Sequence, residues 1–130
     1  MGSRFVKAFL DTHVAVLLFE GRAEDLGAAA VDLIERAALF ISPVVRLELA
    51  FLAEIRRIRA DADSVLAGLA TDLGLSIADD PMAAVIAQSM GLDWTRDPFD
   101  RLLVATAMLH RAPFVTHDRR IHEHYDKAVW

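Results

Sequence analysis

Cysteine is absent from the sequence, and long apolar runs are absent as well. Without cysteine, the 130 residues hold no disulfide, no thiolate metal ligand and no cysteine nucleophile, which suits a reducing compartment. The longest apolar stretches, at 14–19 and 102–109, fall well short of the roughly 20 residues that span a bilayer. The N-terminus shows no basic segment followed by an apolar stretch and a cleavage site. We therefore expect a cytoplasmic protein with no membrane contact.

Positive charge is also scarce, with 14 lysines and arginines against 19 aspartates and glutamates and a net charge of −5. This balance argues against simple binding of nucleic acid through phosphate contacts, which usually needs an excess of basic residues. Two bound divalent cations would bring the net charge from −5 to −1 and weaken that objection. With 55% hydrophobic residues and no repeat or linker, residues 1–130 predict one domain with a single core.

Short apolar runs alternate along the chain with longer helical patterns. Strands are predicted at 5–10, 39–41, 75–77, 114–116 and 128–130, and helices at 28–38, 43–59, 61–73, 81–90 and 97–111. Ser42 and Pro43 supply a cap and a first-turn proline for the second helix, and Gly91 closes the fourth. This alternation predicts an α/β fold with a parallel sheet covered by helices on both faces.

Two acids follow predicted strands. Asp11 comes after the first strand, and Asp118 comes after the strand at 114–116. Ligands of open α/β sheets bind at the carboxyl ends of the strands, where both acids are expected to lie. For either acid alone, capping of the following helix is an equally good interpretation.

Glu48 lies on an apolar face of its predicted helix. The residues that share this face, at spacings of three, four and seven, are Val44, Phe51, Leu52 and Ile55. A carboxylate that points to the interior needs a partner to offset its lost hydration. That partner is either a metal ion or an arginine, with Arg46 and Arg101 as candidates.

Asp100 shares a predicted helix face with apolar residues, which are Leu103, Val104, Ala107 and Met108. Asp97 is well placed to cap this helix, with Asp100 three residues later as in a capping box. We assign the cap to Asp97 and leave Asp100 to chemistry. Four acids at one end of a sheet would repel one another, and they suit the oxygen-preferring cations Mg²⁺ and Mn²⁺. Two such cations about 4 Å apart support hydrolysis of a phosphodiester by an activated water.

Four motifs resemble the PIN-domain ribonucleases, especially the toxins of bacterial VapBC toxin–antitoxin pairs. The motifs extend over nearly the whole chain: LDTH at 10–13, VRLELA at 45–50, RDPFDRLLVATA at 96–107 and THDR at 116–119. The resemblance implies a single PIN domain over 1–130, a three-layer α/β/α sandwich with a central parallel sheet of four to five strands. It also implies an acidic metal site for Mg²⁺ or Mn²⁺, formed by Asp11, Glu48, Asp100 and Asp118.

Further residues and partners follow from the same resemblance. Thr12 and Thr116 would orient the ligating carboxylates through hydrogen bonds, and Asp97 belongs to the third motif. The expected activity is that of a toxin, an endoribonuclease that cuts tRNA or rRNA. Expected partners are a second copy of the chain and a VapB-type antitoxin whose C-terminal segment enters the active-site groove. The wording at 92–95 departs from the family, which bears on substrate preference.

An alternative function is that of a catalytically silent PIN domain that binds protein or RNA. The intact acids argue against this alternative, because loss of a ligand is the simplest route to an inactive domain. Arginines provide candidate RNA contacts, since guanidinium groups bind phosphate bidentately. Arg119 and Arg120 directly follow Asp118, whereas the cluster of arginines at 56, 57 and 59 suits RNA, an antitoxin or plain solvent exposure equally.

Aromatic and histidine side chains are weaker candidates. The histidines at 117, 122 and 124 lie close together but match no common zinc pattern. His13 and His117 each adjoin a proposed ligand and are candidates for substrate contact. Trp94 and Trp130 are interpreted either as stacking platforms for bases or as packing residues of the core or a dimer interface.

Overall fold

A five-stranded parallel sheet forms the centre of the computed structural model, which describes residues 6–130. The strands are β1 (Lys7–Leu10), β2 (Ala38–Ile41), β3 (Ser76–Ile77), β4 (Phe114–Val115) and β5 (Ala128–Val129). Their order is β3-β2-β1-β4-β5, and every neighbouring pair is parallel. The predicted parallel sheet of four to five strands is therefore confirmed. Phe5, which the first predicted strand included, lies outside the described residues.

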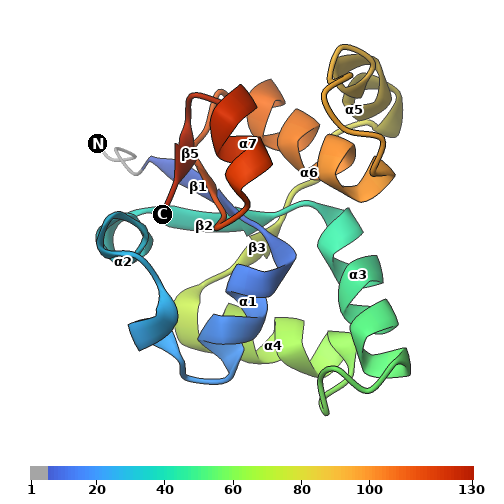
Figure 1. Ribbon diagram of the computed structural model, residues 1–130. Coiled ribbons are helices and arrows are strands. Elements are labelled where there is room, and N and C mark those ends of the chain that lie inside the picture. The colour runs from blue at the N-terminus through green and yellow to red at the C-terminus, as the bar shows by residue number, and fades with distance from the viewer. Residues whose placement is uncertain (1–5) are drawn as a thin grey trace.

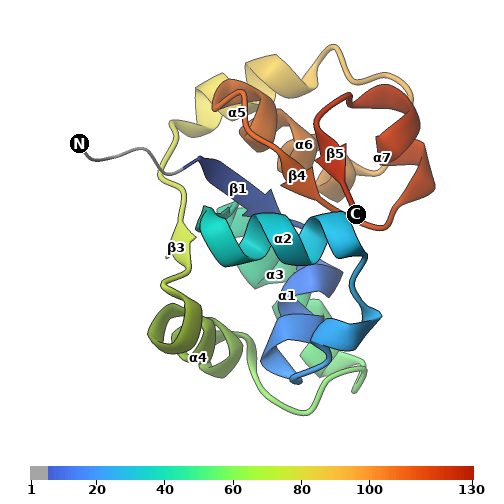
Figure 2. The same ribbon diagram turned by 90° about the vertical axis from the view of Figure 1, so that its left-hand side faces the viewer.

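Helices cover the sheet on both faces, which confirms the three-layer α/β/α arrangement (Figure 1). One layer holds α1 (Thr12–Phe19), the short 3₁₀ helix η1 (Ala23–Asp25), α2 (Ala28–Arg36), α3 (Pro43–Glu54) and α4 (Ala62–Leu73). The other holds α5 (Met82–Ser89), α6 (Pro98–Leu109) and α7 (Arg119–His124), as the turned view also shows (Figure 2). From β1 the chain moves through β2 to β3 at one edge of the sheet, and from there it crosses to β4 and β5 at the other edge. Because connections between parallel strands are right-handed, the helices of these two sets of connections lie on opposite faces of the sheet.

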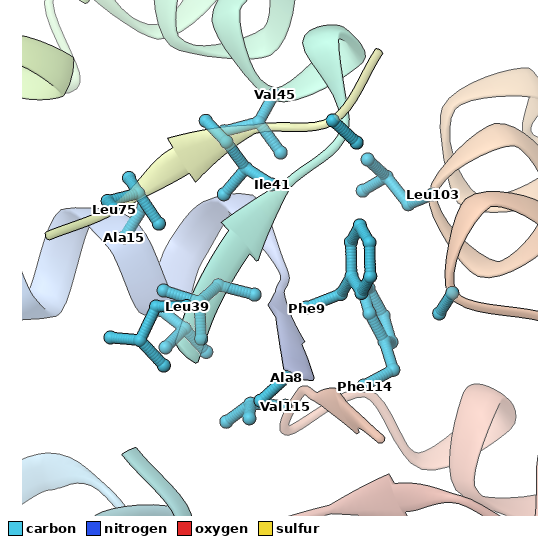
Figure 3. Close-up of a cluster of buried hydrophobic side chains, with 14 of the residues drawn as sticks. Ala8, Phe9, Ala15, Leu39, Ile41, Val45, Leu75, Leu103, Phe114 and Val115 are labelled. Carbon is cyan, nitrogen blue, oxygen red and sulfur yellow. The ribbon is translucent and has the colours of Figure 1, made fainter. Parts of the chain in front are cut away.

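The core lies on both faces of the central strand β1 and of its neighbour β4. Phe9 and Phe114 are register partners on these strands, and both point toward Leu103 of α6 (Figure 3). Leu39 of β2 points away from that group, to the side of the sheet where Ala15 of α1 lies (Figure 3). All five side chains are buried. Burial on both faces explains why these strands are continuously apolar rather than alternating, as is usual for parallel sheets.

Helix α3 ends five residues earlier than the sequence pattern predicted. Ser42 caps it and Pro43 occupies its first turn, as expected, but the helix stops at Glu54 rather than at position 59. Arg56 then adopts a left-handed conformation with φ of 61°, and the chain turns into the loop before α4. A left-handed arginine is costly, and such positions usually carry glycine. Because no glycine or proline marks the end of α3, and the apolar spacing continues beyond it, the sequence pattern predicted a longer helix.

Helix α4 ends at Gly74, a closing residue that was not among the predicted helix caps. Gly74 caps it in the left-handed conformation, with φ of 68°. Gly91, expected to close the next helix in this way, does follow the cap of α5, but its φ is not left-handed. Helices α1 and α7 begin directly after Asp11 and Asp118. No helix within residues 6–130 has the length and apolar character needed to cross a membrane.

Gly27 is a point of close backbone approach, since a methyl group added there would overlap the main-chain carbonyl of Trp130. The C-terminus lies beside α2 in both views (Figures 1 and 2). We expect Gly27→Ala to reduce the free energy of unfolding by about 1–3 kcal/mol, as overpacking typically does. Urea denaturation measures the change.

Gly91→Ala is the matched control, because an added methyl group meets nothing within 4 Å and the backbone is not left-handed there. Its effect should stay within about 0.5 kcal/mol. Equal destabilisation by the two alanines would show that the approach of Trp130 to Gly27 is not tightly packed.

Candidate active site

A pocket opens at the carboxyl ends of β1 and β4, the point where the sheet's connections change direction. The main-chain N–H of Asp11 donates to the carbonyl of Val115 at 3.0 Å, which ties the ends of these strands together. Open α/β sheets bind ligands at such switch points. The cavity has a volume of about 520 Å³ and is lined by Asp11, Thr12, His13, Glu48, Phe51, Leu52, Asp100, His117 and Asp118. All four predicted acids therefore line one pocket, although they come from four distant segments.

Asp11 is the most deeply placed acid, with 8% of its surface exposed. It caps α1, and its carboxylate accepts hydrogen bonds from the main-chain N–H of Thr12 at 2.7 Å and from the hydroxyl of Thr116 at 2.6 Å. Burial raises the pKa of Asp11, while nearby His13 and these hydrogen bonds act in the opposite direction. Asp11 therefore both caps α1 and lines the pocket, so the two interpretations do not exclude each other.

Glu48 borders the pocket from α3. Its carboxylate accepts a 2.5 Å hydrogen bond from the hydroxyl of Thr12. Its pKa is raised, mainly by burial and further by the negative charges of Asp11 and Asp97. The arginine alternative is wrong: Arg46 pairs with Asp63, and Arg101 donates to the carbonyl of Thr95.

The face of α3 that carries Glu48 is not the buried face that the sequence pattern predicted. Val45 and Leu49 are the fully buried residues of this helix, whereas Phe51 and Ile55 are 42% and 63% exposed. Glu48 and Phe51 do share a face, but that face borders the pocket. Apolar spacing identified which residues point the same way, and it could not distinguish the core from a cavity.

Asp100 lies in the first turn of α6, where Asp97 provides the cap as predicted. The carboxylate of Asp97 accepts from the main-chain N–H groups of Phe99 and Asp100 at 2.8 and 3.3 Å. The hydroxyl of Thr95 accepts from the N–H of Asp97, and its carbonyl accepts from Arg101 at 2.7 Å, which fixes the start of this helix. Asp97 itself is exposed and does not line the pocket.

The pKa of Asp100 is raised from its ordinary value of 3.8 to about 7. Burial is the main cause, and four neighbouring carboxylates add to it: Asp97, Asp11, Asp118 and Glu48. No lysine or arginine lines this pocket within the described residues. The electrostatics of the pocket therefore favour a positively charged ligand.

Asp118 caps α7 and accepts from the main-chain N–H of Ile121 at 3.1 Å. Its own N–H donates to the hydroxyl of Thr116 at 3.0 Å, and that hydroxyl donates in turn to Asp11. Thr116 is fully buried and links the ends of β1 and β4. Across residues 6–130, however, no three acidic, histidine or cysteine side chains stand close enough to form a ready-made metal cage. The assignment of the four acids as metal ligands stays a prediction.

Neither group of candidate arginines lines the acidic pocket. Arg119 and Arg120 are exposed on α7, where Arg119 lies 3.7 Å from Glu123. The arginines at 56, 57 and 59 border a separate hollow with Val16 and Phe19 of α1. Their contacts with RNA or an antitoxin stay predictions.

The histidines near the C-terminus do not converge on a zinc site. A ring nitrogen of His122 lies 2.7 Å from the carbonyl of Thr116, and His124 stacks on Trp94. His117 instead lines the acidic pocket, with its ring 4.6 Å from that of Trp130. Both tryptophans are thus packing residues for histidine rings.

His13 also lines the pocket and adjoins its most buried acid. Its Nε2 accepts from the main-chain N–H of His117 at 3.3 Å, which places the ring proton on Nδ1. That Nδ1 lies 3.6 Å from Asp11. The predicted position of His13 and His117 beside the acids agrees with this geometry, and their contact with substrate stays a prediction.

Asp100 should make the metal-free protein less stable as the pH rises. The pKa of this carboxyl is ordinarily 3.8, and it rises to about 7 in the folded state. Between pH 3.8 and pH 7 the carboxyl is therefore protonated in the folded state but mostly ionised in the unfolded state. The free energy of unfolding should fall over this range and level off above pH 7. We expect Asp100→Asn to remove about 1–2 kcal/mol of that fall, after discounting for solvent screening of a half-buried group. Urea denaturation in EDTA at pH 5 and pH 8 measures it.

Asp72→Asn, at an exposed position on α4, is the control and should keep the wild-type pH dependence. Parallel pH profiles for wild type and Asp100→Asn would count against the raised pKa.

The comparisons with known proteins agree with this arrangement. The model of the PIN domain family matches residues 8–127. Ribonuclease VapC22 of Mycobacterium tuberculosis is 36% identical over 118 residues, which are 88% of this chain and 89% of that protein. A chain of a toxin–antitoxin complex from Klebsiella pneumoniae has a similar fold, with a TM-score of 0.69 at 22% identity over 95% of this chain and 96% of that one. A chain of VapBC2 from Rickettsia felis, solved with a promoter DNA fragment, has a TM-score of 0.62 at 16% identity over the same shares. The chain therefore belongs to the PIN domain family.

Proposed function

We propose that this protein is an endoribonuclease that hydrolyses RNA phosphodiester bonds with Mg²⁺ or Mn²⁺ held by Asp11, Glu48, Asp100 and Asp118. The observation that carries the proposal is the gathering of these carboxylates in one pocket that no lysine or arginine lines within the described residues. Membership of the PIN family and the likeness to Ribonuclease VapC22 support RNA as the substrate.

The residues present fit a hard divalent cation. Carboxylate oxygens are the ligands that Mg²⁺ and Mn²⁺ prefer. Burial raises the pKa values of Asp11, Glu48 and Asp100, and neighbouring carboxylates raise them further, so a bound cation would relieve the cost of keeping these acids charged. When bound, such cations supply an activated water and stabilise the leaving oxygen of the phosphodiester. The acids would hold the cations, and this role needs no covalent nucleophile from the chain.

The threonine hydroxyls would set the direction of two of these carboxylates. The hydroxyl of Thr12 donates to one oxygen of Glu48, which leaves the other oxygen for a ligand. The two oxygens of Asp11 are each held by one hydrogen bond, from the main-chain N–H of Thr12 and from the hydroxyl of Thr116, and their remaining lone pairs are left for a ligand. Groups behind metal ligands commonly fix orientation in this way. The Nδ1 of His13 lies 3.6 Å from the carboxylate of Asp11, and it would further restrict that carboxylate.

We further propose that the enzyme is a toxin controlled by a VapB-type antitoxin, that it forms a homodimer and that it acts in the cytoplasm on tRNA or rRNA. The support is the name of the relative and the fold shared with chains of toxin–antitoxin complexes. Co-expression with the product of an adjacent small gene, followed by co-purification, tests the pairing.

Purified wild-type protein should cleave RNA in the presence of Mg²⁺ or Mn²⁺, and EDTA should abolish the cleavage. Asp11→Asn and Asp100→Asn should each lower the rate at least about 100-fold, because even residues behind metal ligands are worth about 10–100-fold. Gel analysis of total RNA, with mapping of new 5′ ends, measures this.

Asp63→Asn, an exposed change away from the pocket, should retain full activity and controls for general effects of losing a carboxylate. Equal cleavage by wild type, Asp11→Asn and Asp100→Asn would contradict the proposed role of the acids. RNA binding without cleavage by wild type would instead favour a silent binding module.

Thr116→Val should weaken Mn²⁺ binding about 10–100-fold, because the loss of its hydroxyl frees Asp11 to rotate. Isothermal titration with Mn²⁺ alone measures the affinity without any assay of activity.

Thr106→Val is the matched control, since Thr106 is equally buried but its hydroxyl bonds within α6, to the carbonyl of Leu102. It should leave Mn²⁺ affinity unchanged. The orienting role of Thr116 fails if both valine variants lose affinity alike.

A further inference from the structure

Phe51 forms an aromatic wall of the acidic pocket. It lies one helical turn after Glu48 on α3, it lines the same cavity as the four acids, and 42% of its surface is exposed. Burial in the core therefore does not account for this ring. A large, partly exposed apolar side chain beside a group of carboxylates suggests a ligand with two parts. One part would interact with the acids or their bound cations, and the other would be an apolar surface that packs on the ring.

The orientation of the ring is fixed by a second aromatic residue. Phe51 and Phe99 meet edge to face, with ring centroids 5.6 Å apart and planes inclined at 67°. Phe99 directly precedes Asp100 at the start of α6. The aromatic pair is thus attached to the same two helices that carry Glu48 and Asp100. The position of the ring relative to these acids is set by the packing of α3 on α6.

We propose that Phe51 stacks against an unpaired base of the RNA, next to the phosphate that is cleaved. This inference rests on the proposed function, which brings an RNA chain into the pocket. A nucleotide joins a charged phosphate to a flat, weakly polar ring, so it matches a cation-binding group and an aromatic surface side by side. Stacking on a phenyl ring tolerates every base, because each base has a π-face.

A cationic side chain of a protein partner is the other occupant that suits acids and a ring. Cations held by the four carboxylates would repel such a side chain, but they would attract a phosphate. The metal-loaded pocket therefore favours the nucleotide. Because a base within a duplex is stacked on its neighbours, only an unpaired base can lie on Phe51.

The test compares Phe51→Leu with Phe51→Trp on a short single-stranded RNA and on the same sequence paired into a duplex. Phe51→Leu should raise KM for the single strand about 5- to 150-fold, the value of one base stacked on an aromatic ring, with a smaller change in kcat. Phe51→Trp should keep or lower KM. The duplex should be a poor substrate for wild type and should respond little to either variant.

Ile55→Ala is the matched control, because Ile55 is exposed at the C-terminal cap of the same helix but lies outside the pocket. The KM of this variant should equal that of wild type. A direct readout places 2-aminopurine at each position of the single strand and follows its fluorescence after rapid mixing with Mn²⁺-loaded protein. Wild type should quench the base beside the cleaved bond, and Phe51→Leu should not.

Wild-type KM and wild-type quenching in a correctly folded Phe51→Leu variant overturn the inference, and so does a duplex that is cut as well as the single strand. Loss of affinity for a co-purified protein partner with unchanged KM for RNA also overturns it, in favour of a peptide occupant. Absence of cleavage by wild type contradicts the proposed function instead, while quenching by wild type but not by Phe51→Leu would still support the stacking contact.

Discussion

Repulsion among carboxylates is the constraint on which this end of the molecule depends. Two of the acids are compensated by the local backbone, because Asp11 and Asp118 cap helices and accept main-chain hydrogen bonds. Glu48 receives a hydroxyl. The carboxylate of Asp100 has no such bond within the described residues, and burial together with the neighbouring carboxylates raises its pKa to about 7. Stability is sacrificed at this position, as it commonly is where a site is held ready for a ligand.

The sheet makes that concentration of charge possible. Strands β1 and β4 are buried on both faces. Because they are parallel neighbours, their carboxyl ends lie side by side, so the residues that follow the two strands lie at the same edge of the sheet. Thr116 then joins the two ends, since its hydroxyl donates to Asp11 and accepts from the N–H of Asp118. A single buried hydroxyl therefore links both strand ends to two of the acids. Such a link is more rigid than one made by exposed side chains.

Sequence patterns were sufficient for features that depend on local chemistry. The positions of Asp11 and Asp118 after strands, and the caps at Ser42 and Asp97, depend on residues close together in the chain, and all were predictable. Other features were not, and two of them bear on the pocket. The early end of α3 relies on a left-handed arginine, which has no sequence signal, and apolar periodicity could not tell that the face of Phe51 borders a cavity. Both depend on how distant segments pack, which is a property of the tertiary fold.

The geometry of the pocket depends on how the two helical layers pack, because α3 and α6 contact each other there. These helices belong to opposite layers of the sandwich, and they meet beyond the carboxyl edge of the sheet through Phe51 and Phe99. Glu48 and Asp100 are carried by the same two helices, so a shift of one layer against the other would separate the acids and the aromatic pair together. Edge-to-face packing is specific in geometry, and it favours one relative position of the layers. By fixing the position of α3 relative to α6, the aromatic pair therefore both aligns Glu48 with Asp100 and holds the ring of Phe51 at the pocket.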